Sequence, residues 1–316
     1  MDHVSVVVAA SQATPFIGEA IDSVFLQKYP KLELLVVGDD LQDNGRLGKI
    51  LAQHGSSIVF VENVGGGLAA ARNAGCASAT GDLIAILDPS DVWEPDYLRI
   101  QLDALQSNPS ADVVYSNASF FGDAHLNAVL YMDRYPSHGP VTFESVCWEH
   151  CNILGASLFR RDRLLAVGGY DLRVPASGID FDLFLRLLHA GAEVVYHGHP
   201  VYRMRRSADS RSEIEEMKSK LVLVDVLSQL AETLDLTASQ RHALDARLDR
   251  LRARLSVIDG KNALNTGDWP RAKERLRFAS QYDPSVKLGL VRLATAVCPG
   301  ALSRLMRWRA EHMAGR

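Results

Sequence analysis

Residues 81–93 read Gly-Asp-Leu-Ile-Ala-Ile-Leu-Asp-Pro-Ser-Asp-Val-Trp, and they predict the centre of the fold. Five apolar residues, Leu83 to Leu87, run without interruption, and the acids Asp88 and Asp91 follow them. A short apolar run bounded by turn-forming residues predicts a strand buried on both faces. Carboxylates at the carboxyl end of such a strand lie where open α/β sheets bind their ligands. The alternative is that Asp-Pro-Ser-Asp is only a turn that caps the next helix.

The segments before this stretch alternate between strand and helix patterns. Strand patterns occupy residues 4–10, 32–37 and 57–61, and helical patterns occupy residues 16–27, 45–54 and 68–78. Strict alternation predicts parallel strands joined by right-handed crossovers. The strand at 32–37 also ends in acids, Asp39 and Asp40. Because the carboxyl ends of parallel strands share one edge of the sheet, these acids are expected to form a single acidic rim with Asp88 and Asp91.

The second part of the chain changes character at Ser212. Before it we expect helices at 96–105 and 180–189, strands at 113–115, 153–160 and 193–196, and an irregular polar segment at 120–138. After it the pattern is wholly helical, with long amphipathic segments at 221–236 and 238–259 and one helical hairpin at 260–284. The sequence therefore predicts two domains. Residues 1–211 form an α/β domain with a mostly parallel, Rossmann-like sheet flanked by helices, and residues 212–316 form an all-helical extension.

Composition excludes some classes of protein. The chain has 316 residues, 47% hydrophobic and 23% charged, which is typical of a globular protein. Its net charge of -4 argues against a general affinity for nucleic acid. Residues 271–316 contain ten basic and three acidic residues. The formal charge of this segment is therefore +7, and that of the rest of the chain is -11.

The four cysteines have no paired spacing, which favours a reducing compartment. Cys147, His150 and Cys151 could share a helix face, but no second pair completes a zinc site, and buried thiols are favoured. The N-terminus lacks the pattern of a secretion signal. The best apolar run near the C-terminus is interrupted by Arg292, so no bilayer-spanning segment is expected. These features predict a cytoplasmic protein.

The basic C-terminal segment offers two interpretations. Its arginines alternate with Leu302, Leu305, Met306 and Trp308, a pattern that suits peripheral contact with an anionic membrane. The alternative is an ordinary solvated face of a packed helix. The helical region as a whole is expected to serve as a homodimer surface, an acceptor-side cover or a membrane contact.

A dinucleotide-binding fingerprint competes for the same residues. Gly65, Gly67 and Ala70 fit G-x-G-x-x-A, and Asp88 lies near the expected acidic position. The fingerprint should follow a strand directly, however, and residues 62–64 intervene. It also leaves Asp91 and Trp93 unexplained. A phosphate-cradling P-loop is excluded because no Lys-Ser or Lys-Thr follows the glycines.

Seven segments, in order, resemble the family-2 glycosyltransferases, whose nucleotide-sugar domain has the GT-A fold. They are residues 4–11 (Val-Ser-Val-Val-Val-Ala-Ala-Ser), 20–30 (Ala-Ile-Asp-Ser-Val-Phe-Leu-Gln-Lys-Tyr-Pro), 35–40 (Leu-Val-Val-Gly-Asp-Asp), 70–75 (Ala-Ala-Arg-Asn-Ala-Gly), 87–93 (Leu-Asp-Pro-Ser-Asp-Val-Trp), 168–171 (Gly-Gly-Tyr-Asp) and 180–186 (Asp-Phe-Asp-Leu-Phe-Leu-Arg). The resemblance covers about residues 4–206. Each segment alone is weak evidence for the family, but seven segments in the family's order and spacing are strong evidence.

The resemblance implies roles for individual residues. Asp39 would contact the nucleoside, Arg72 would lie near the nucleotide, and Ala9, Ala10 and Ser11 would line the nucleotide-sugar site. The family's Asp-x-Asp segment corresponds to Asp88 and Ser90, with Asp91 following. Asp180 matches the general base, for which a carboxylate suffices when its geometry is right. The alternative for Asp180 is a helix cap.

Several positions depart from the family pattern. Ala9-Ala10 replaces the usual Pro-Thr, and Ile179 replaces the acid that normally precedes the base. Ser90 replaces the second Asp of Asp-x-Asp, and Arg205 stands where the Tyr-Arg-x-His segment carries histidine. A hydroxyl and a guanidinium cannot replace carboxylate and imidazole as ligands of Mg²⁺ or Mn²⁺.

Two hypotheses about the divalent cation follow. In the first, metal dependence is weak or absent, and Arg205, aided by Arg203, supplies positive charge to the pyrophosphate. In the second, Asp91 acts as a metal ligand together with Asp88 and holds Mg²⁺ or Mn²⁺.

The resemblance implies an inverting glycosyltransferase that moves a sugar from a nucleotide-diphosphate sugar to a glycan, lipid-linked or other acceptor hydroxyl, as in the synthesis of bacterial surface polysaccharides or glycoconjugates. The acceptor pocket is expected in the variable loops at about residues 120–152. The alternatives are a catalytically silent nucleotide- or glycan-binding scaffold and, less favoured, a dinucleotide-dependent oxidoreductase or a nucleotidyltransferase.

Overall fold

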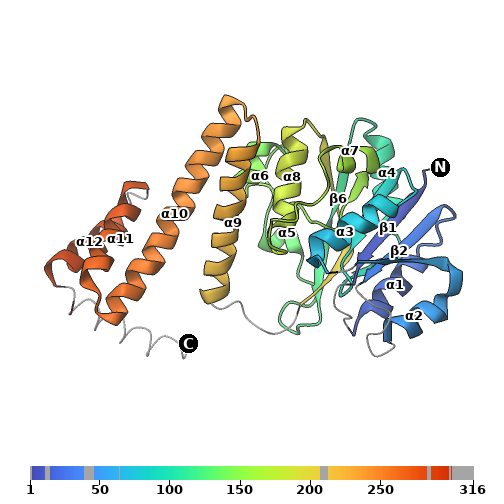
Figure 1. Ribbon diagram of the computed structural model, residues 1–316, viewed down its shortest axis with the longest axis horizontal. Coiled ribbons are helices and arrows are strands. Elements are labelled where there is room, and N and C mark those ends of the chain that lie inside the picture. Colours follow the sequence, from blue (N-terminus) through green and yellow to red (C-terminus); the bar gives the residue numbers. More distant parts are fainter. Residues whose placement is uncertain are drawn as a thin grey trace. The chain divides into compact units, whose positions relative to one another are not determined.

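A computed structural model describes residues 2–10, 15–38, 46–63, 65–206, 213–282, 286–298 and 300. The chain divides into two compact units, residues 1–210 and residues 211–316 (Figure 1). The first unit contains the sheet, and the second is built from helices.

The first unit opens with alternating strands and helices. They are β1 (Val4–Ala9), α1 (Ile17–Phe25), β2 (Leu32–Gly38), α2 (Arg46–His54), a 3₁₀ turn (Gly55–Ser57), β3 (Ile58–Glu62), α3 (Gly67–Ser78) and β4 (Leu83–Leu87). The expected apolar strand is present as β4, and all five of its residues are buried.

The rest of the first unit is less regular. Its elements are β5 (Val92–Trp93), α4 (Tyr97–Ser107), β6 (Val113–Phe121), α5 (Tyr131–Arg134), α6 (Phe143–Cys147), β7 (Leu158–Arg160), α7 (Arg161–Ala166), α8 (Ile179–His189) and β8 (Val194–Arg205).

All eight strands form one sheet in the order β3-β2-β1-β4-β7-β6-β8-β5. The first four strands pair in parallel, as their alternation with helices predicts. Strand β7 is antiparallel to both β4 and β6, β8 is parallel to β6, and β5 is antiparallel to β8. The predicted α/β class is confirmed, and the sheet is mixed.

Helices cover both faces of this sheet (Figure 1). The alternate residues Val4, Val6 and Val8 of β1 join one buried cluster with residues of α1 and α4. Val7 points to the other face, where it lies against Gly75 of α3 so closely that a side chain at Gly75 would collide with it. Because successive strand residues face opposite ways, an apolar run such as β1 is buried on both sides.

The strand predictions were wrong in three places. β6 was expected at residues 113–115, but it continues through the polar residues Ser116 and Asn117 to Phe121. Both are buried, and Asn117 Oδ1 accepts hydrogen bonds from the backbone N–H groups of Ala118 (2.8 Å) and Met132 (3.2 Å). Pairing with these backbone donors lets a polar side chain remain inside the fold.

The other two differences involve β8 and β7. β8 continues past Gly198, where φ is 78°, and ends only at Arg205. The segment Tyr202–Arg205 is therefore part of the last strand and does not follow it. β7 is shorter than expected because the chain before it turns, with Ser157 Oγ donating to the carbonyl of Leu154 at 2.5 Å.

The second unit consists of α9 (Glu213–Thr233), α10 (Ala238–Thr266), α11 (Trp269–Tyr282) and α12 (Val286–Val297). A capping box of Thr237 and Gln240 starts α10, and Gly267, with φ of 84°, ends it. The expected hairpin turn is therefore present, although its first helix is continuous from Ala238. Small residues let α10 and α11 approach, since Gly260 lies against Leu276.

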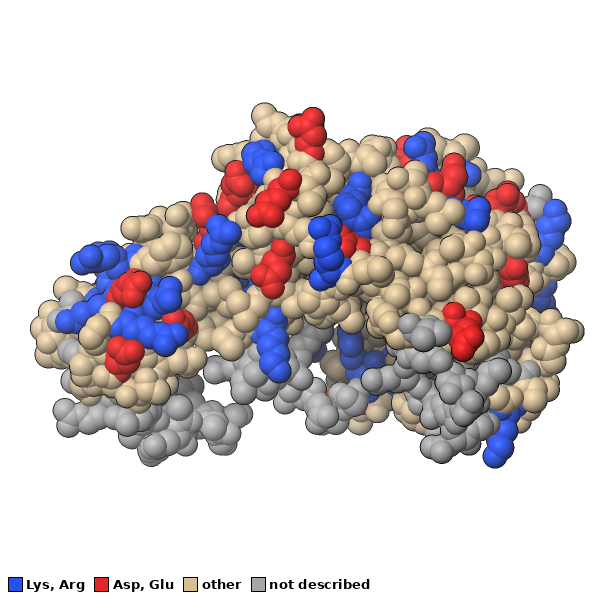
Figure 2. Space-filling model, in the orientation of Figure 1, with Lys and Arg blue, Asp and Glu red and all other residues tan. Residues whose placement is uncertain are grey.

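Lysine and arginine side chains gather around α11 on the face shown in Figure 2, with acidic side chains among them. Asp259 of α10 pairs with both Arg271 and Arg275 at 2.8 Å. Within the described part of the chain, none of the helices has the length and apolar character that crossing a bilayer requires.

Candidate active site

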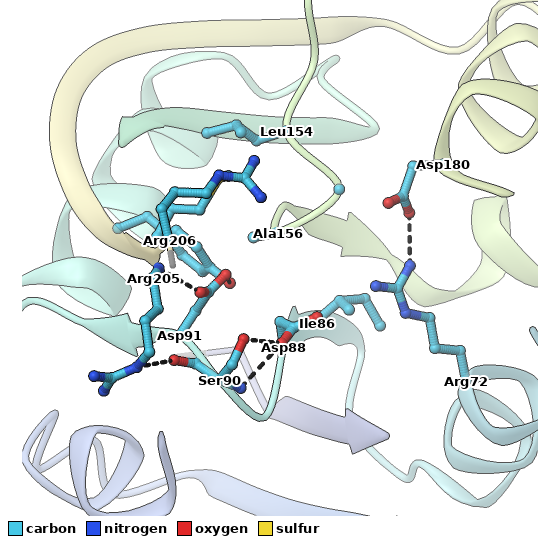
Figure 3. Close-up of a pocket in the computed structure, with 13 residues that line it drawn as sticks. Arg72, Ile86, Asp88, Ser90, Asp91, Leu154, Ala156, Asp180, Arg205 and Arg206 are labelled. Atoms are coloured by element: carbon cyan, nitrogen blue, oxygen red, sulfur yellow. Dashed lines mark hydrogen bonds and ion pairs between the residues drawn. The ribbon is translucent and has the colours of Figure 1, made fainter. Parts of the chain in front are cut away.

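A pocket lies at the carboxyl end of β4 (Figure 3). Its lining comes from β4 and the turn after it, from α3, from the loop before β7, from the start of α8 and from the end of β8. The residues are Arg72, Ile86, Asp88, Ser90, Asp91, Leu154, Gly155, Ala156, Asp180, Tyr202, Met204, Arg205 and Arg206. Asp88 and Asp91 thus lie at a pocket at the carboxyl end of β4, as the sequence predicted, whereas Asp39 and Asp40 lie outside the described residues.

The turn after β4 is held by its own side chains. Asp88 Oδ1 accepts hydrogen bonds from the backbone N–H of Ser90 (2.9 Å) and from its hydroxyl (2.7 Å). The backbone N–H of Asp91 donates to the Asp88 carbonyl at 3.0 Å. These bonds fix Asp88 at the pocket and occupy one of its two carboxylate oxygens.

Asp91 lies deeper and is only 6% exposed. Its Oδ2 accepts from the hydroxyl of Tyr202 at 2.8 Å, and its Oδ1 accepts from the backbone N–H of Arg205 at 2.7 Å. Burial, together with the nearby charge of Asp88, raises the pKa of Asp91 to about 7 despite these donors. Asp91 therefore fastens the turn after β4 to the end of β8.

Arg72 and Asp180 form an ion pair across the pocket, with Arg72 Nη1 2.6 Å from Asp180 Oδ1. Arg72 extends from α3, is largely buried, and has its guanidinium carbon 5.1 Å from the ring centre of Tyr170. Asp180 comes from the first turn of α8, whose N-cap is Gly178. The alternative that Asp180 is a helix cap is therefore wrong, because its side chain is directed to Arg72 (Figure 3).

Gly155 allows the loop before β7 to approach Asp180. A Cβ atom at this position would collide with the Asp180 carboxylate. Sequence reasoning missed this residue, because its role depends on the close approach of two distant segments.

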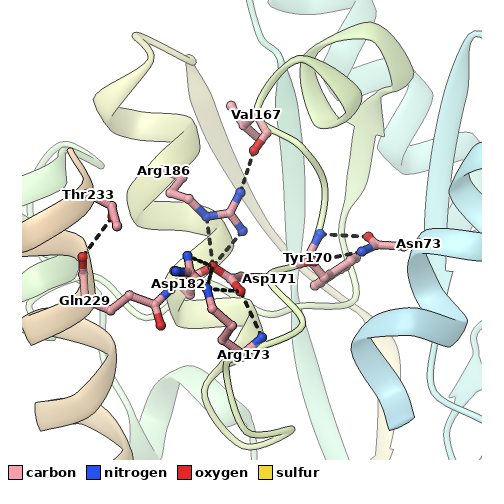
Figure 4. Close-up of polar contacts among 9 residues, drawn as sticks. All are labelled: Asn73, Val167, Tyr170, Asp171, Arg173, Asp182, Arg186, Gln229 and Thr233. Carbon is pink, nitrogen blue, oxygen red and sulfur yellow. Dashed lines mark hydrogen bonds and ion pairs between the residues drawn. The ribbon is translucent and has the colours of Figure 1, made fainter. Parts of the chain in front are cut away.

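Residues next to Arg72 and Asp180 in the sequence form further polar contacts (Figure 4). Asn73 follows Arg72 in α3. Its Oδ1 accepts a hydrogen bond from the backbone N–H of Tyr170 at 2.8 Å, and its Nδ2 donates to the Tyr170 carbonyl at 2.7 Å. Within α8, the fully buried Asp182 accepts from Arg186 Nε (2.8 Å) and Nη2 (2.6 Å), and Arg186 Nη1 donates to the Val167 carbonyl at 2.7 Å. Asp182 is thus a structural acid, whereas Asp180 faces the pocket.

Arg205 is held firmly at the margin of the pocket. Its Nε donates to the Ser90 carbonyl at 2.9 Å, and its Nη2 lies 2.7 Å from Glu19 Oε2. The guanidinium carbon lies 3.8 Å from the ring centre of Phe16 and 4.3 Å from that of Phe121. The sequence did not point to Glu19, the partner of Arg205, or to Arg206. Arg206 also lines the pocket.

The structure describes only two of the remaining predicted site residues. Ala9 and Ala10 are buried at the end of β1, next to β4, and neither lines the pocket. Ser11 and Asp39 lie outside the described residues.

The model of the glycosyl transferase family 2 matches residues 5–165, about half of the chain. The chain belongs to this family. Its relatives include proteins that are named as glycosyltransferases. The relative WfgD of Escherichia coli, a UDP-Glc:alpha-D-GlcNAc-diphosphoundecaprenol beta-1,3-glucosyltransferase, is 36% identical over 115 residues, which are 36% of this chain and 45% of WfgD. The chain likewise spans less than half the length of four other curated relatives that it matches.

Solved structures show the fold of this glycosyltransferase. TarS residues 1–349 of S. aureus, in complex with UDP-GlcNAc, has a TM-score of 0.60 at 13% identity over 98% of this chain and 91% of that one. The mannosyltransferase PcManGT of Pyrobaculum calidifontis, in complex with GDP-Man and Mn²⁺, has a TM-score of 0.61 at 18% identity over 98% and 83% of the two chains. The expected GT-A fold is confirmed.

The membership in this family overturns one alternative. The dinucleotide-binding oxidoreductase is wrong: Gly65 and Gly67 follow β3, which lies at one edge of the sheet, whereas the pocket opens at the end of the central β4.

Members of this fold often use a divalent cation, which needs oxygen ligands in the pocket. Mg²⁺ and Mn²⁺ favour about six oxygen ligands. Among the described residues, no three His, Cys, Asp or Glu side chains are grouped to hold a metal ion. Both oxygens of Asp91 already accept hydrogen bonds, and Ser90 Oγ donates to Asp88. The described side chains of this pocket therefore do not complete the ligand shell of a cation by themselves, and a cation bound at Asp88 would need further oxygen ligands from donor phosphates or water.

Proposed function

We propose that this chain is an inverting glycosyltransferase that moves a sugar from a nucleotide-diphosphate sugar to an acceptor hydroxyl. The observation that carries the proposal is that one pocket contains Asp88 at the end of β4 and Asp180 paired to Arg72 at 2.6 Å. An inverting transfer needs one carboxylate near the acceptor and a polar surface for the donor, and this pocket offers both.

Asp180 is proposed as the general base. Its Oδ1 is fixed by Arg72, while its Oδ2 accepts no hydrogen bond from the described residues. The ion pair with Arg72 therefore holds the Asp180 carboxylate in place and leaves Oδ2 directed at the pocket. In the proposed reaction the acceptor oxygen attacks the anomeric carbon, the bond to the diphosphate oxygen breaks with its electron pair, and the hydroxyl proton passes to Asp180 Oδ2.

The donor is proposed to lie along the strand ends. Asp88, Ser90 and Arg72 line the described pocket. Asp39, which follows β2 in the sequence, is proposed to contact the nucleoside, and Ser11, which follows β1 in the sequence, is proposed to contribute to the same nucleotide-sugar site. The ligands of the two structural relatives, UDP-GlcNAc and GDP-Man, support a nucleotide-diphosphate sugar as the donor.

The acceptor is proposed to be a glycan or a lipid-linked saccharide. The lipid-linked substrate in the name of WfgD supports this choice. A role in bacterial surface-polysaccharide or glycoconjugate synthesis at the cytoplasmic face of a membrane follows from it. Residues 1–211 would form the catalytic domain, and the basic C-terminal region of residues 212–316 would contact the membrane.

A panel of nucleotides and nucleotide sugars tests the donor proposal. A ligand that binds only the folded state raises the melting temperature by mass action. We expect one nucleoside diphosphate and its sugar conjugates to raise it, and the anomeric configuration of the transferred sugar, read by NMR, to be inverted. The absence of any shift across the panel, or retention of configuration, would overturn the proposal.

Liposome sedimentation tests the membrane contact separately. We expect the protein to sediment with vesicles that contain anionic lipid, and replacement of Arg304, Arg307 and Arg309 by Gln to reduce this binding. Equal sedimentation of the two proteins would show that these arginines make no membrane contact.

A further inference from the structure

Arg205 and Arg206 are consecutive residues at the end of β8, and their side chains have opposite surroundings. The guanidinium of Arg205 is engaged by the Ser90 carbonyl, Glu19 and two aromatic rings. The side chain of Arg206 extends into the pocket toward Leu154, whereas that of Arg205 lies beside Ser90 (Figure 3).

The charge of Arg206 acts on Asp91, where it opposes the rise in the pKa of that carboxyl. Its guanidinium carbon lies 5.6 Å from the ring centre of Phe120, and its backbone N–H donates to the Phe121 carbonyl at 2.8 Å. Within the part of the chain that the structure describes, its side chain forms no ion pair and no hydrogen bond. The other two arginines of the pocket are paired, Arg72 with Asp180 and Arg205 with Glu19.

The backbone of β8 explains this arrangement. Successive side chains of an extended segment point to opposite sides. The register at the strand end is fixed twice, because Asp91 Oδ1 accepts the Arg205 N–H and the Phe121 carbonyl accepts the Arg206 N–H. With Arg205 anchored on one side, the next side chain is directed to the other side, into the pocket.

The charges of the pocket require such a cation. Asp88 and Asp91 have no ion-pair partner among the described residues, so an anionic diphosphate that enters the pocket meets two acids. The pocket does not hold a divalent cation with its own side chains, as described above. A guanidinium can bind phosphate oxygens with two parallel hydrogen bonds and stays protonated throughout the reaction.

We propose that Arg206 binds the diphosphate of the donor and neutralises the leaving group in the role that a divalent cation would otherwise fill. Arg205 is a positioning residue, because its anchored side chain directs the side chain of Arg206 into the pocket. This inference rests on the proposed function. As the bond between the anomeric carbon and the phosphate oxygen breaks, the electron pair passes to that oxygen, Arg206 stabilises the new negative charge, and the proton of the acceptor remains on Asp180.

Calorimetric titration of the full chain tests the proposal. The wild type and Arg206→Ala are titrated with UDP or GDP, with the matching nucleoside monophosphate and with the nucleoside, each with and without EDTA. A charged hydrogen bond to phosphate is lost in the variant, so its diphosphate affinity should fall by roughly 10-fold or more. Affinity for the monophosphate and nucleoside should change by less than about threefold, and EDTA should leave the wild-type affinities unchanged on the same scale.

Three further variants complete the experiment. Arg99→Ala removes an exposed arginine of α4 that forms surface pairs with Asp96 and Asp103, and it should behave as the wild type. Arg206→Lys keeps the charge and should recover part of the diphosphate affinity. Arg205→Ala should weaken diphosphate binding, and the double variant should bind no more weakly than Arg206→Ala alone, since Arg205 acts through Arg206.

The outcomes separate the two proposals. Wild-type protein that binds none of the nucleotides overturns the proposed function and this inference with it. Wild-type protein that binds a nucleoside diphosphate, while Arg206→Ala retains that affinity, overturns only the role of Arg206. Loss of diphosphate binding in EDTA, or an equal loss of nucleoside and diphosphate affinity in Arg206→Ala, also overturns it.

Discussion

Arg72 Nη1 lies 2.6 Å from Asp180 Oδ1, and these two residues stand 108 positions apart in the chain. The contact joins α3 to the start of α8, and Asn73, the neighbour of Arg72, binds the Tyr170 backbone through two hydrogen bonds. One short piece of α3 therefore positions both the candidate base and the turn that leads to it.

Replacing Asp180 by Asn tests its role as the base. The amide keeps the size of the side chain but cannot accept the proton of the acceptor, so transfer should fall by about 10²- to 10⁴-fold. Affinity for the donor nucleotide, measured by calorimetry, should stay near that of the wild type. An equal loss of transfer and nucleotide binding would instead make Asp180 a structural residue.

Gly155→Ala tests whether the position of Asp180 matters as well as its chemistry. The added methyl group would collide with the Asp180 carboxylate and displace it. We expect kcat to fall by about tenfold or more, since small displacements of a catalytic group are expensive, while KM for the donor changes little. Gly289→Ala is a control, because a Cβ at Gly289 meets no atom within 4 Å. Unchanged kcat in Gly155→Ala would show that the carboxylate can move without loss.

Asp91 should make folding stability depend on pH. Its pKa is raised from 3.8 to about 7 in the folded protein, mainly by burial. A raised folded-state pKa means that the folded protein binds the proton more tightly than the unfolded chain. This contribution is complete below pH 3.8 and is lost as the pH rises through 7, with a total of about 4 kcal/mol.

Urea unfolding at intervals between pH 4 and pH 8 measures this effect. Asp91→Asn has no proton to lose, so its free energy of unfolding should fall less over this interval than that of the wild type. Parallel curves for the two proteins would show that the pKa of Asp91 is not raised.

The buried ion pair of α8 should be essential to stability. Arg186→Met leaves the carboxylate of the fully buried Asp182 without its partner, which should lower the free energy of unfolding by about 3–5 kcal/mol. Asp182→Leu combined with Arg186→Met removes both charges and should recover much of the loss. Arg173→Ala removes an exposed arginine and should leave the free energy of unfolding close to that of the wild type. Chemical denaturation measures all three, and a double variant as unstable as the single one would contradict this account.

Local pattern was sufficient to predict the first half of the sheet. The apolar runs of β1, β2 and β4 are buried on both faces, so their sequences contain little besides Val, Ile, Leu and Ala, and their boundaries could be predicted to within a residue or two. β6 and β8 could not be predicted in this way. Their polar residues, such as Asn117, are stabilised by partners that only the folded chain supplies.

The sequence by itself determined that Asp88 follows a buried central strand, because strand burial and the position of an acid after it are both local properties. It also placed Asp180 at the start of a helix. Only the tertiary structure decided that Asp180 meets Arg72, that Asp182 two residues later is buried with Arg186, and that Arg206 faces the pocket while Arg205 is anchored beside it. The physical reason is that ion pairing and burial depend on which distant segments pack together, and the spacing of residues along one chain does not contain that information.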